Sequence, residues 1–148
     1  MIVRKATPAD APALVEAFFA MMEEAGFGPP VQGSGPARLL ASITAGTGDG
    51  SQGWFVCEDG GQIVATAGAI LQLTPLDDVL VGKRAIIVGV YTRPDYRKRG
   101  AARMVVAAAV EWCRGAGVAL VRLQTTQAGR PLYESLGFTV GDIMTLRL

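Results

Sequence analysis

Residues 88–102 combine side chains and spacing that suit the binding of an anion. The segment V-G-V-Y-T-R-P-D-Y-R-K-R-G-A-A reads as an apolar strand, a proline turn and a basic entry into a long apolar helix. Free N–H groups at a helix N-terminus point outward, and the helix dipole favours negative charge there. Arg97, Lys98 and Arg99 add positive charge, and Gly100 lets a phosphate approach the backbone closely. The sequence therefore predicts a phosphate-binding turn.

The charge of the chain is concentrated around this turn. The formal net charge of the whole chain is only +1. Residues 83–103 hold seven basic residues and one acid, a local charge of +6, whereas residues 1–82 hold three basic residues and nine acids, a local charge of −6. A compact basic patch favours a small polyanion over a nucleic acid duplex, which needs a broader basic face. The alternative is a charged loop that is merely solvated.

Composition excludes several other chemistries. With 148 residues, half of them apolar, residues 1–148 are expected to form one domain with a sizeable core. The absence of histidine excludes Ser–His and Cys–His nucleophilic schemes and histidine-based metal sites. Cys57 and Cys113 have no partner at metal-ligand spacing, so no metal is expected. No apolar run approaches the roughly 20 residues of a membrane-spanning helix, and no signal-peptide layout is seen. We expect a cytoplasmic protein without membrane partners.

Apolar periodicity predicts the elements that position the turn. The strand over residues 83–92 is apolar on both faces, as expected at the centre of a covered sheet. Gly89 interrupts it, which predicts a β-bulge or a close approach of a ligand; packing room for a facing helix is the alternative. The other expected strands are 1–6, 54–58, 62–73, 118–123 and one or two within 138–148, and the expected helices are 10–25, 36–45, 101–114 and 129–136.

Two motifs together resemble those of the GCN5-related N-acetyltransferases (GNATs). Arg97-x-x-Gly100-x-Ala102, after a strand that ends Val90-Tyr91-Thr92-x-Pro94, is similar to the family signature (R/Q)-x-x-G-x-(G/A). Some thirty residues later, Thr126-x-x-Gly129-x-x-Leu132-Tyr133-Glu134-x-x-Gly137-Phe138 resembles the element N-x-x-A-x-x-L-Y-x-x-x-G-F. Their order and separation fit the family, and the resemblance spans nearly the whole chain. Thr126 stands where many relatives carry Asn, and Gly129 where they carry Ala.

The resemblance implies a fold of the α/β (α+β) class. Its sheet would be mixed and mostly antiparallel, with six to seven strands and about four helices on both faces. The central strand would be bulged and would splay from its neighbour, leaving free amides for the pantetheine arm of coenzyme A. Residues 26–53 would form part of the acceptor site, although a solvent-exposed connector fits their glycines equally well. Crossed homodimers through the last strand are common in the family, but nothing in the sequence selects one.

The resemblance also implies an acyltransferase that moves the acetyl group of acetyl-CoA to a primary amine of a small molecule, peptide or protein by direct attack. The backbone of residues 97–102 would bind the pyrophosphate, and Val90 N–H would polarise the thioester carbonyl. Tyr133 would be the general acid, with packing among apolar neighbours as its alternative role. The expected cofactor-binding residues are Val90, Tyr91, Thr92, Arg97, Lys98, Arg99, Gly100, Ala101, Ala102, Thr126, Gly129 and Tyr133.

The general base stays open. Many relatives place a Glu about eleven residues before the signature, but that position holds Ile86 here. Glu58, Asp77 and Asp78 are alternatives that would act through water, although acids at strand ends and turns are usually just solvated. The acidic residues 1–82 suit a cationic acceptor on charge complementarity alone. A non-catalytic acyl-CoA-binding module is the second hypothesis. A nucleotide-binding α/β domain is disfavoured, because no Walker A or G-x-G-x-x-G motif follows any strand.

Overall fold

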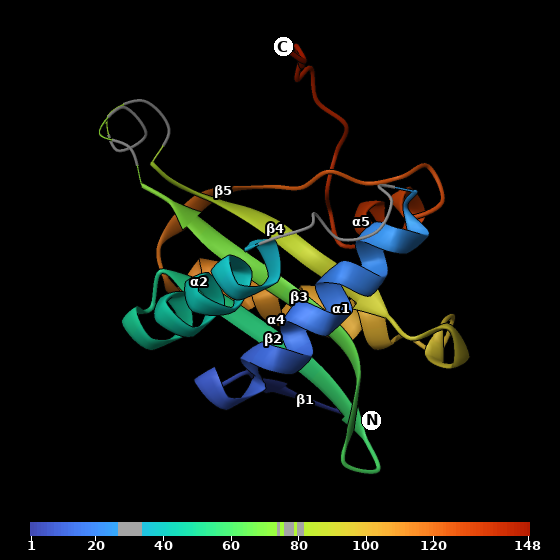
Figure 1. The fold of residues 1–148 in the computed structure, drawn as a ribbon. Helices are drawn as coiled ribbons and strands as arrows, with labels where there is room; N and C mark the ends of the chain where they lie inside the picture. Colours follow the sequence, from blue (N-terminus) through green and yellow to red (C-terminus); the bar gives the residue numbers. More distant parts are fainter. Residues whose placement is uncertain (27–33, 74, 76–78, 80–81) are drawn as a thin grey trace.

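A five-stranded sheet forms the middle of the molecule, with helices on both faces (Figure 1). The computed structural model describes the chain except residues 27–33, 74, 76–78 and 80–81, so Asp77 and Asp78 lie outside the described residues. The strand order is β1-β2-β3-β4-β5, with antiparallel pairs up to β4 and a parallel pair β4–β5. The strands are β1 Ile2–Lys5, β2 Gln52–Asp59, β3 Gln62–Gln72, β4 Lys83–Thr92 and β5 Val118–Arg122.

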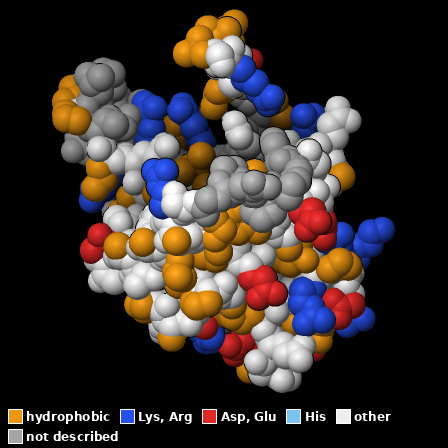
Figure 2. Space-filling model, in the orientation of Figure 1, with side chains coloured by type: hydrophobic (Ala, Val, Ile, Leu, Met, Phe, Trp, Pro, Cys, Tyr) orange, Lys and Arg blue, Asp and Glu red, His pale blue; other side chains and the backbone are white. Residues whose placement is uncertain are grey.

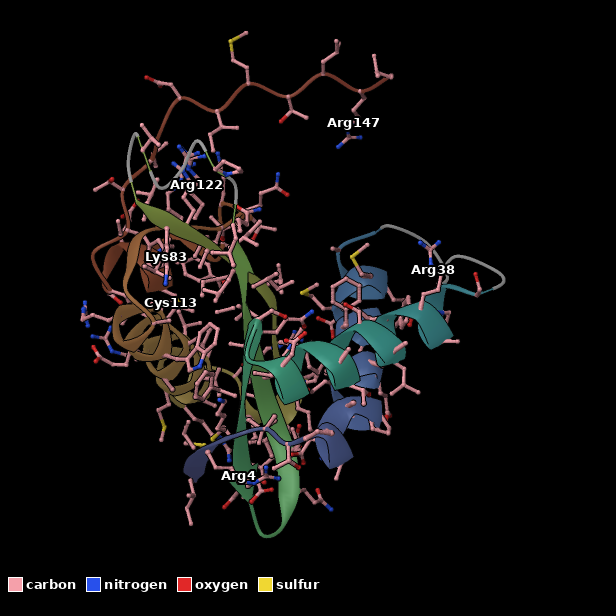
Figure 3. All side chains as sticks on the ribbon, turned by 90° about the vertical axis from the view of Figure 1, so that its left-hand side faces the viewer. Arg4, Arg38, Lys83, Cys113, Arg122 and Arg147 are labelled. Atoms are coloured by element: carbon pink, nitrogen blue, oxygen red, sulfur yellow. The ribbon has the colours of Figure 1, made fainter. Side chains whose placement is uncertain are left out.

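Two apolar layers hold the helices to the sheet. Alternate residues of β2 point to opposite faces, so Trp54 and Val56 pack beneath α1 and α2, while Phe55 and Cys57 pack beneath α4. Figure 3 shows the sheet edge-on between α4 on one side and the pair α1 and α2 on the other. The helices are α1 Ala11–Glu24, α2 Gly35–Asp49, α4 Ala101–Gly115 and α5 Arg130–Glu134, with short 3-10 turns at Pro8–Asp10 and Pro94–Tyr96.

The prediction of six to seven strands is wrong for the described residues. Residues 138–148 form no strand, and in Figure 1 they leave the sheet and end in a projecting tail. Their alternating apolar pattern suits a strand, but a strand forms only where a neighbouring edge supplies hydrogen bonds. Among the described strands, β5 pairs with β4 alone, and residues 139–143 and 145 of the tail line a groove with β5 without forming a strand. Large apolar side chains are therefore exposed on the tail: Val140, Ile143, Met144, Leu146 and Leu148.

Gly89 forms a β-bulge, as its position within a buried strand predicts. On β3, Ala67 alone lies between the partners of Tyr91 and Val88, whereas two residues lie between them on β4. Gly89 has a φ of +60°, and the Thr66 hydroxyl donates to its carbonyl oxygen at 2.8 Å. A Cβ on Gly89 would lie 2.7 Å from the Trp54 ring, so this glycine also makes room for packing. The predicted bulge is therefore observed, and the room that Gly89 leaves is taken by Trp54 of β2 instead of by the facing helix.

β4 lies between β3 and β5 at its start but pairs with β3 alone at its end. Its pairing with β3 continues to Thr92, opposite Ala65. Its pairing with β5 stops at Ile86, opposite Arg122. The strands diverge there, and none of the described strands pairs with residues 87–92 on the β5 side. In the described part of the chain, no helix is long and apolar enough to span a membrane.

The Gly89→Ala substitution is expected to destabilise the fold by about 2–6 kcal/mol, because a left-handed φ and overlap with the Trp54 ring each cost about 1–3 kcal/mol. Urea unfolding measures the change. Gly48→Ala is the matched control, because it adds the same methyl group to α2 with nothing within 4 Å of it. The control is expected to be neutral, or to stabilise by up to about 1 kcal/mol. Equal stability of the two variants would contradict the role of Gly89.

Candidate functional site

The chain forms a concave turn between β4 and α4. Arg97 is extended, Lys98 has a φ of +59° and Gly100 a φ of +86°. Lys98 is the one non-glycine residue with a positive φ among the described residues. Left-handed residues in a turn bring successive N–H groups to one concave side, which suits an anion. No side chain caps the N-terminus of α4, so its first N–H groups stay available to a ligand.

A small cleft of about 220 Å³ opens at this turn. Thr92 lies at its edge, and the Thr92 hydroxyl is buried without a hydrogen-bond partner among the described residues. A buried polar group without a partner is costly, so this hydroxyl points to a ligand with polar groups of its own. The cleft is lined by Thr92, Tyr96, Arg97, Lys98, Gly100, Ala101, Ala102, Arg103 and Leu132. Six of the expected binding residues therefore meet at one place.

The remaining residues of the first motif are placed differently. The Arg99 guanidinium stacks over the Tyr96 ring at 5.1 Å and is not part of the cleft lining. Val90 packs against the apolar layer under α4. Burial raises the pKa of the Tyr91 phenol, and the nearby Glu24 carboxylate raises it further. Tyr96 was not predicted as a site residue, although it follows the Pro94 turn within the motif.

The second motif shapes the entry to α5. Gly129 N–H donates to the Thr126 hydroxyl oxygen at 3.2 Å, so Thr126 ties the loop before the helix. A Cβ on Gly129 would lie 2.6 Å from the Thr125 hydroxyl, which explains the glycine at this position. The Thr126 hydroxyl still has its own proton to donate. Neither residue lines the cleft at the β4–α4 turn.

Tyr133 lies in the core beneath α4 and is only 9% exposed. Its ring meets Phe138 edge to face, with centroids 5.9 Å apart. Burial raises the pKa of the phenol above its usual value of 10, so Tyr133 keeps its proton at neutral pH. Tyr133 also lines a groove of about 860 Å³ beside β5. It therefore packs, as the alternative interpretation expects, and it also holds a proton next to an open groove.

Glu58 is committed to another interaction. Its carboxylate accepts two hydrogen bonds from Arg4, at 2.6 and 3.0 Å. Arg4 also binds Asp10 at 2.8 and 2.9 Å, and these bonds lower the pKa of Asp10 to about 2. Figure 3 places Arg4 beside β1, at the end of the sheet away from the tail. Asp59 accepts a hydrogen bond from the Tyr96 hydroxyl. Glu58 and Asp10 together thus hold Arg4 at this end of the sheet.

The structure adds one acid that the sequence did not indicate. Glu24, the last residue of α1, accepts a hydrogen bond of 2.5 Å from Arg97 of the turn. Seventy-three positions separate the two residues in the chain. No local pattern could have paired them, because only the packing of α1 on β4 brings them together.

Comparisons with known proteins agree on one family. The model of the acetyltransferase (GNAT) family matches residues 16–138. A GCN5-related N-acetyltransferase from Ralstonia eutropha JMP134 has a TM-score of 0.86 at 25% identity, covering 99% of this chain and 97% of that one. A predicted acetyltransferase with acetyl-CoA from Clostridium acetobutylicum has a TM-score of 0.84 at 23% identity, covering 99% and 95%.

A third similar structure is that of an enzyme whose name states its substrate. The glucosamine-6-phosphate N-acetyltransferase from Arabidopsis thaliana has a TM-score of 0.76 at 18% identity, covering 99% of this chain and 97% of that one. At this identity the likeness concerns the fold alone. No curated protein gives a significant match.

Proposed function

The chain belongs to the GNAT family of acetyltransferases, and we propose that it transfers the acetyl group of acetyl-CoA to a primary amine of a small molecule, peptide or protein. The concave turn between β4 and α4 is the observation that carries this proposal. Its uncapped helix start and left-handed Lys98 suit a pyrophosphate. The unpaired side of β4 and the buried Thr92 hydroxyl suit a chain with amides of its own. The residues present therefore fit coenzyme A.

In this proposal each group of the site has a separate task. The backbone N–H groups of residues 97–102 hold the pyrophosphate, and the free side of β4 aligns the pantetheine arm. The N–H of Val90 donates to the thioester carbonyl oxygen, where negative charge develops. Acetyl-CoA supplies an activated thioester: the amine nitrogen bonds to the carbonyl carbon while the carbon–sulfur bond breaks. Tyr133 gives its proton to the departing thiolate.

The amine must also lose a proton, and no described acid is assigned that task. Glu58 is held by Arg4, and Ile86 replaces the glutamate that many relatives carry. Water is the acceptor of the proton in this proposal, so the fraction of uncharged amine controls the rate. The same missing base favours the second candidate function, a non-catalytic acyl-CoA-binding module. Turnover of amines separates the two functions.

The proposal includes a homodimer formed through the projecting tail. Figure 2 shows hydrophobic side chains gathered at the tip of this tail, and Figure 3 places Arg147 on it, away from the sheet. From Met144 on, the tail alternates: Met144, Leu146 and Leu148 share one parity, and Thr145 and Arg147 fall on the other, as in a half-buried strand. Asp142 and Ile143 do not follow this alternation. The outer edge of β5 is open. A tail from a second copy fits this edge, because it would pair both sets of backbone groups.

Thermal unfolding with added coenzyme A tests cofactor binding. Acetyl-CoA or CoA at about 100 times its Kd is expected to stabilise the protein by about 2.7 kcal/mol, which raises Tm by several degrees. ATP should give no comparable rise. Gly100→Asp is expected to abolish the rise, because it places a carboxylate at the turn. Gly50→Asp is its matched control, with a φ of +80° against +86° and open space at both positions. If no CoA species raises Tm, the proposed function is wrong.

The Tyr133→Phe substitution tests the general acid. It keeps the ring that meets Phe138, so the fold and the Kd for CoA should stay unchanged. Loss of the proton donor is expected to lower kcat by about 100-fold or more. The raised pKa of the phenol places any fall of the wild-type rate above about pH 10, and the variant should not show that fall. Unchanged turnover would remove Tyr133 from the mechanism.

The Leu146→Lys substitution tests the dimer. A lysine on the apolar side of the tail should prevent pairing with a second copy and give a monomer in light scattering after size-exclusion chromatography. Thr145→Lys is the matched control, because it adds the same charge one residue away, on the polar side of the tail. The control should stay dimeric. A monomeric wild-type protein, or equal masses for the two variants, would contradict this interface.

A further inference from the structure

Glu24 lies where the cofactor turn meets the end of α1. Its carboxylate accepts the hydrogen bond from Arg97 Nη2, and both side chains are nearly half exposed. The Nε of Arg97 donates to the Thr92 carbonyl oxygen at 3.0 Å, so the guanidinium lies across the end of β4. Arg97 and Thr92 both line the cleft. Exposed ion pairs are weak, so a phosphate in the cleft can compete for this arginine.

The other neighbour of Glu24 is the bulged strand. Burial raises the pKa of the Tyr91 phenol, and the negative charge of the nearby Glu24 carboxylate raises it further. α1 covers this face of β4, and Phe18 of α1 comes within 3.8 Å of a Cβ position on Gly89. The opposite face is filled by the buried side chains of α4, among them Val105 and Val106. Helices therefore cover both faces of β4 beside the bulge, and Glu24, which is nearly half exposed, lies at the C-terminal end of the covering α1.

The acids that surround this region are mostly engaged elsewhere. Asp10 and Glu58 bind Arg4. Asp95 pairs with Arg93, and Asp59 accepts from the Tyr96 hydroxyl. Two described carboxylates have hydrogen-bonding partners that line the cofactor cleft: Asp59 accepts from Tyr96, and Glu24 accepts from Arg97. Of these two, Glu24 is the one that binds a cation of the cleft. Its charge is thus available to a new partner whenever Arg97 turns to a phosphate.

We propose that Glu24 is a specificity-determining residue of the acceptor site: acetyl-CoA phosphates compete with it for Arg97, and the freed carboxylate then binds the ammonium group of a cationic amine. This inference rests on the proposed acetyltransferase function. The two substrates would then bind cooperatively. The phosphates draw Arg97 away from Glu24 and the ammonium group draws Glu24 away from Arg97, so each substrate frees the group that the other one binds. Coupling of this kind is reciprocal, so a cationic amine should strengthen CoA binding by the same factor as CoA strengthens amine binding.

The Glu24→Gln substitution tests the competition for Arg97. Removal of the carboxylate charge is expected to tighten CoA binding about 3- to 10-fold in calorimetry at low salt, and the gain should shrink at high salt. Glu23→Gln is the matched control, because it removes the same charge one position earlier, about 100° around the helix. The control should change the Kd by less than about twofold. Equal Kd values for the two variants would overturn the inference.

Steady-state kinetics test the acceptor side. The amines are 1,4-diaminobutane, glucosamine, a lysine-containing peptide and an arylamine that is uncharged at neutral pH. Glu24→Gln is expected to raise KM about tenfold for the cationic amines, with little change for the arylamine or in kcat. An equal KM for all amines in both proteins would overturn the acceptor role. So would a wild-type protein that binds CoA but acetylates only the arylamine, or none of these amines. If the wild-type protein does not bind CoA, the proposed function itself fails.

Discussion

The packing of Trp54 against Gly89 is the contact on which the site geometry depends. The indole ring fills the space beside two glycines on neighbouring strands, 2.7 Å from a Cβ position on Gly68 and on Gly89. The indole N–H donates to Gln52, and Gln52 donates to the Ser42 hydroxyl of α2. The helix thus fixes the ring, and the ring requires glycine at the bulge. The bulge in turn shifts the side-chain alternation of β4 by one residue.

This shift explains how residues of β4 before and after the bulge pack against helices on opposite faces of the sheet. Val88, before the bulge, packs under α1 and α2, whereas Val90, after it, packs under α4. Tyr91 lies near Glu24 at the end of α1, and Thr92 lines the cleft at the start of α4. A regular strand would place Val88 and Val90 on the same face. The bulge therefore places Thr92 beside the turn without removing the strand from the sheet, and β5 can diverge because β4 keeps its pairing with β3.

The sequence predicted what depends on neighbouring residues and missed what depends on distant ones. Strong periodicity placed α1, α4 and β4 within a few residues, and Gly89 indicated the bulge because few other roles suit a glycine in a buried strand. The family motif correctly indicated which residues lie together at the β4–α4 turn. No local pattern in the sequence indicated that Glu24 pairs with Arg97 or that Glu58 pairs with Arg4. The strand expected within residues 138–148 shows the same limit, because an alternating apolar pattern predicts a strand but does not show whether a neighbouring strand is there to pair with it.

Electrostatic pairing divides the acids of this chain into two groups with different consequences. Asp10 and Glu58 share Arg4, and the low pKa of Asp10 means that this network stabilises the fold above about pH 4 and weakens as the pH falls toward 2. Loss of either carboxylate would leave the partly buried Arg4 with one partner instead of two. The pair Glu24–Arg97 lies in solvent and joins two segments, so either member can exchange its partner at low cost. The tightly bound acids thus stabilise the fold, whereas the loosely bound Glu24 is the acid that we propose for the acceptor amine.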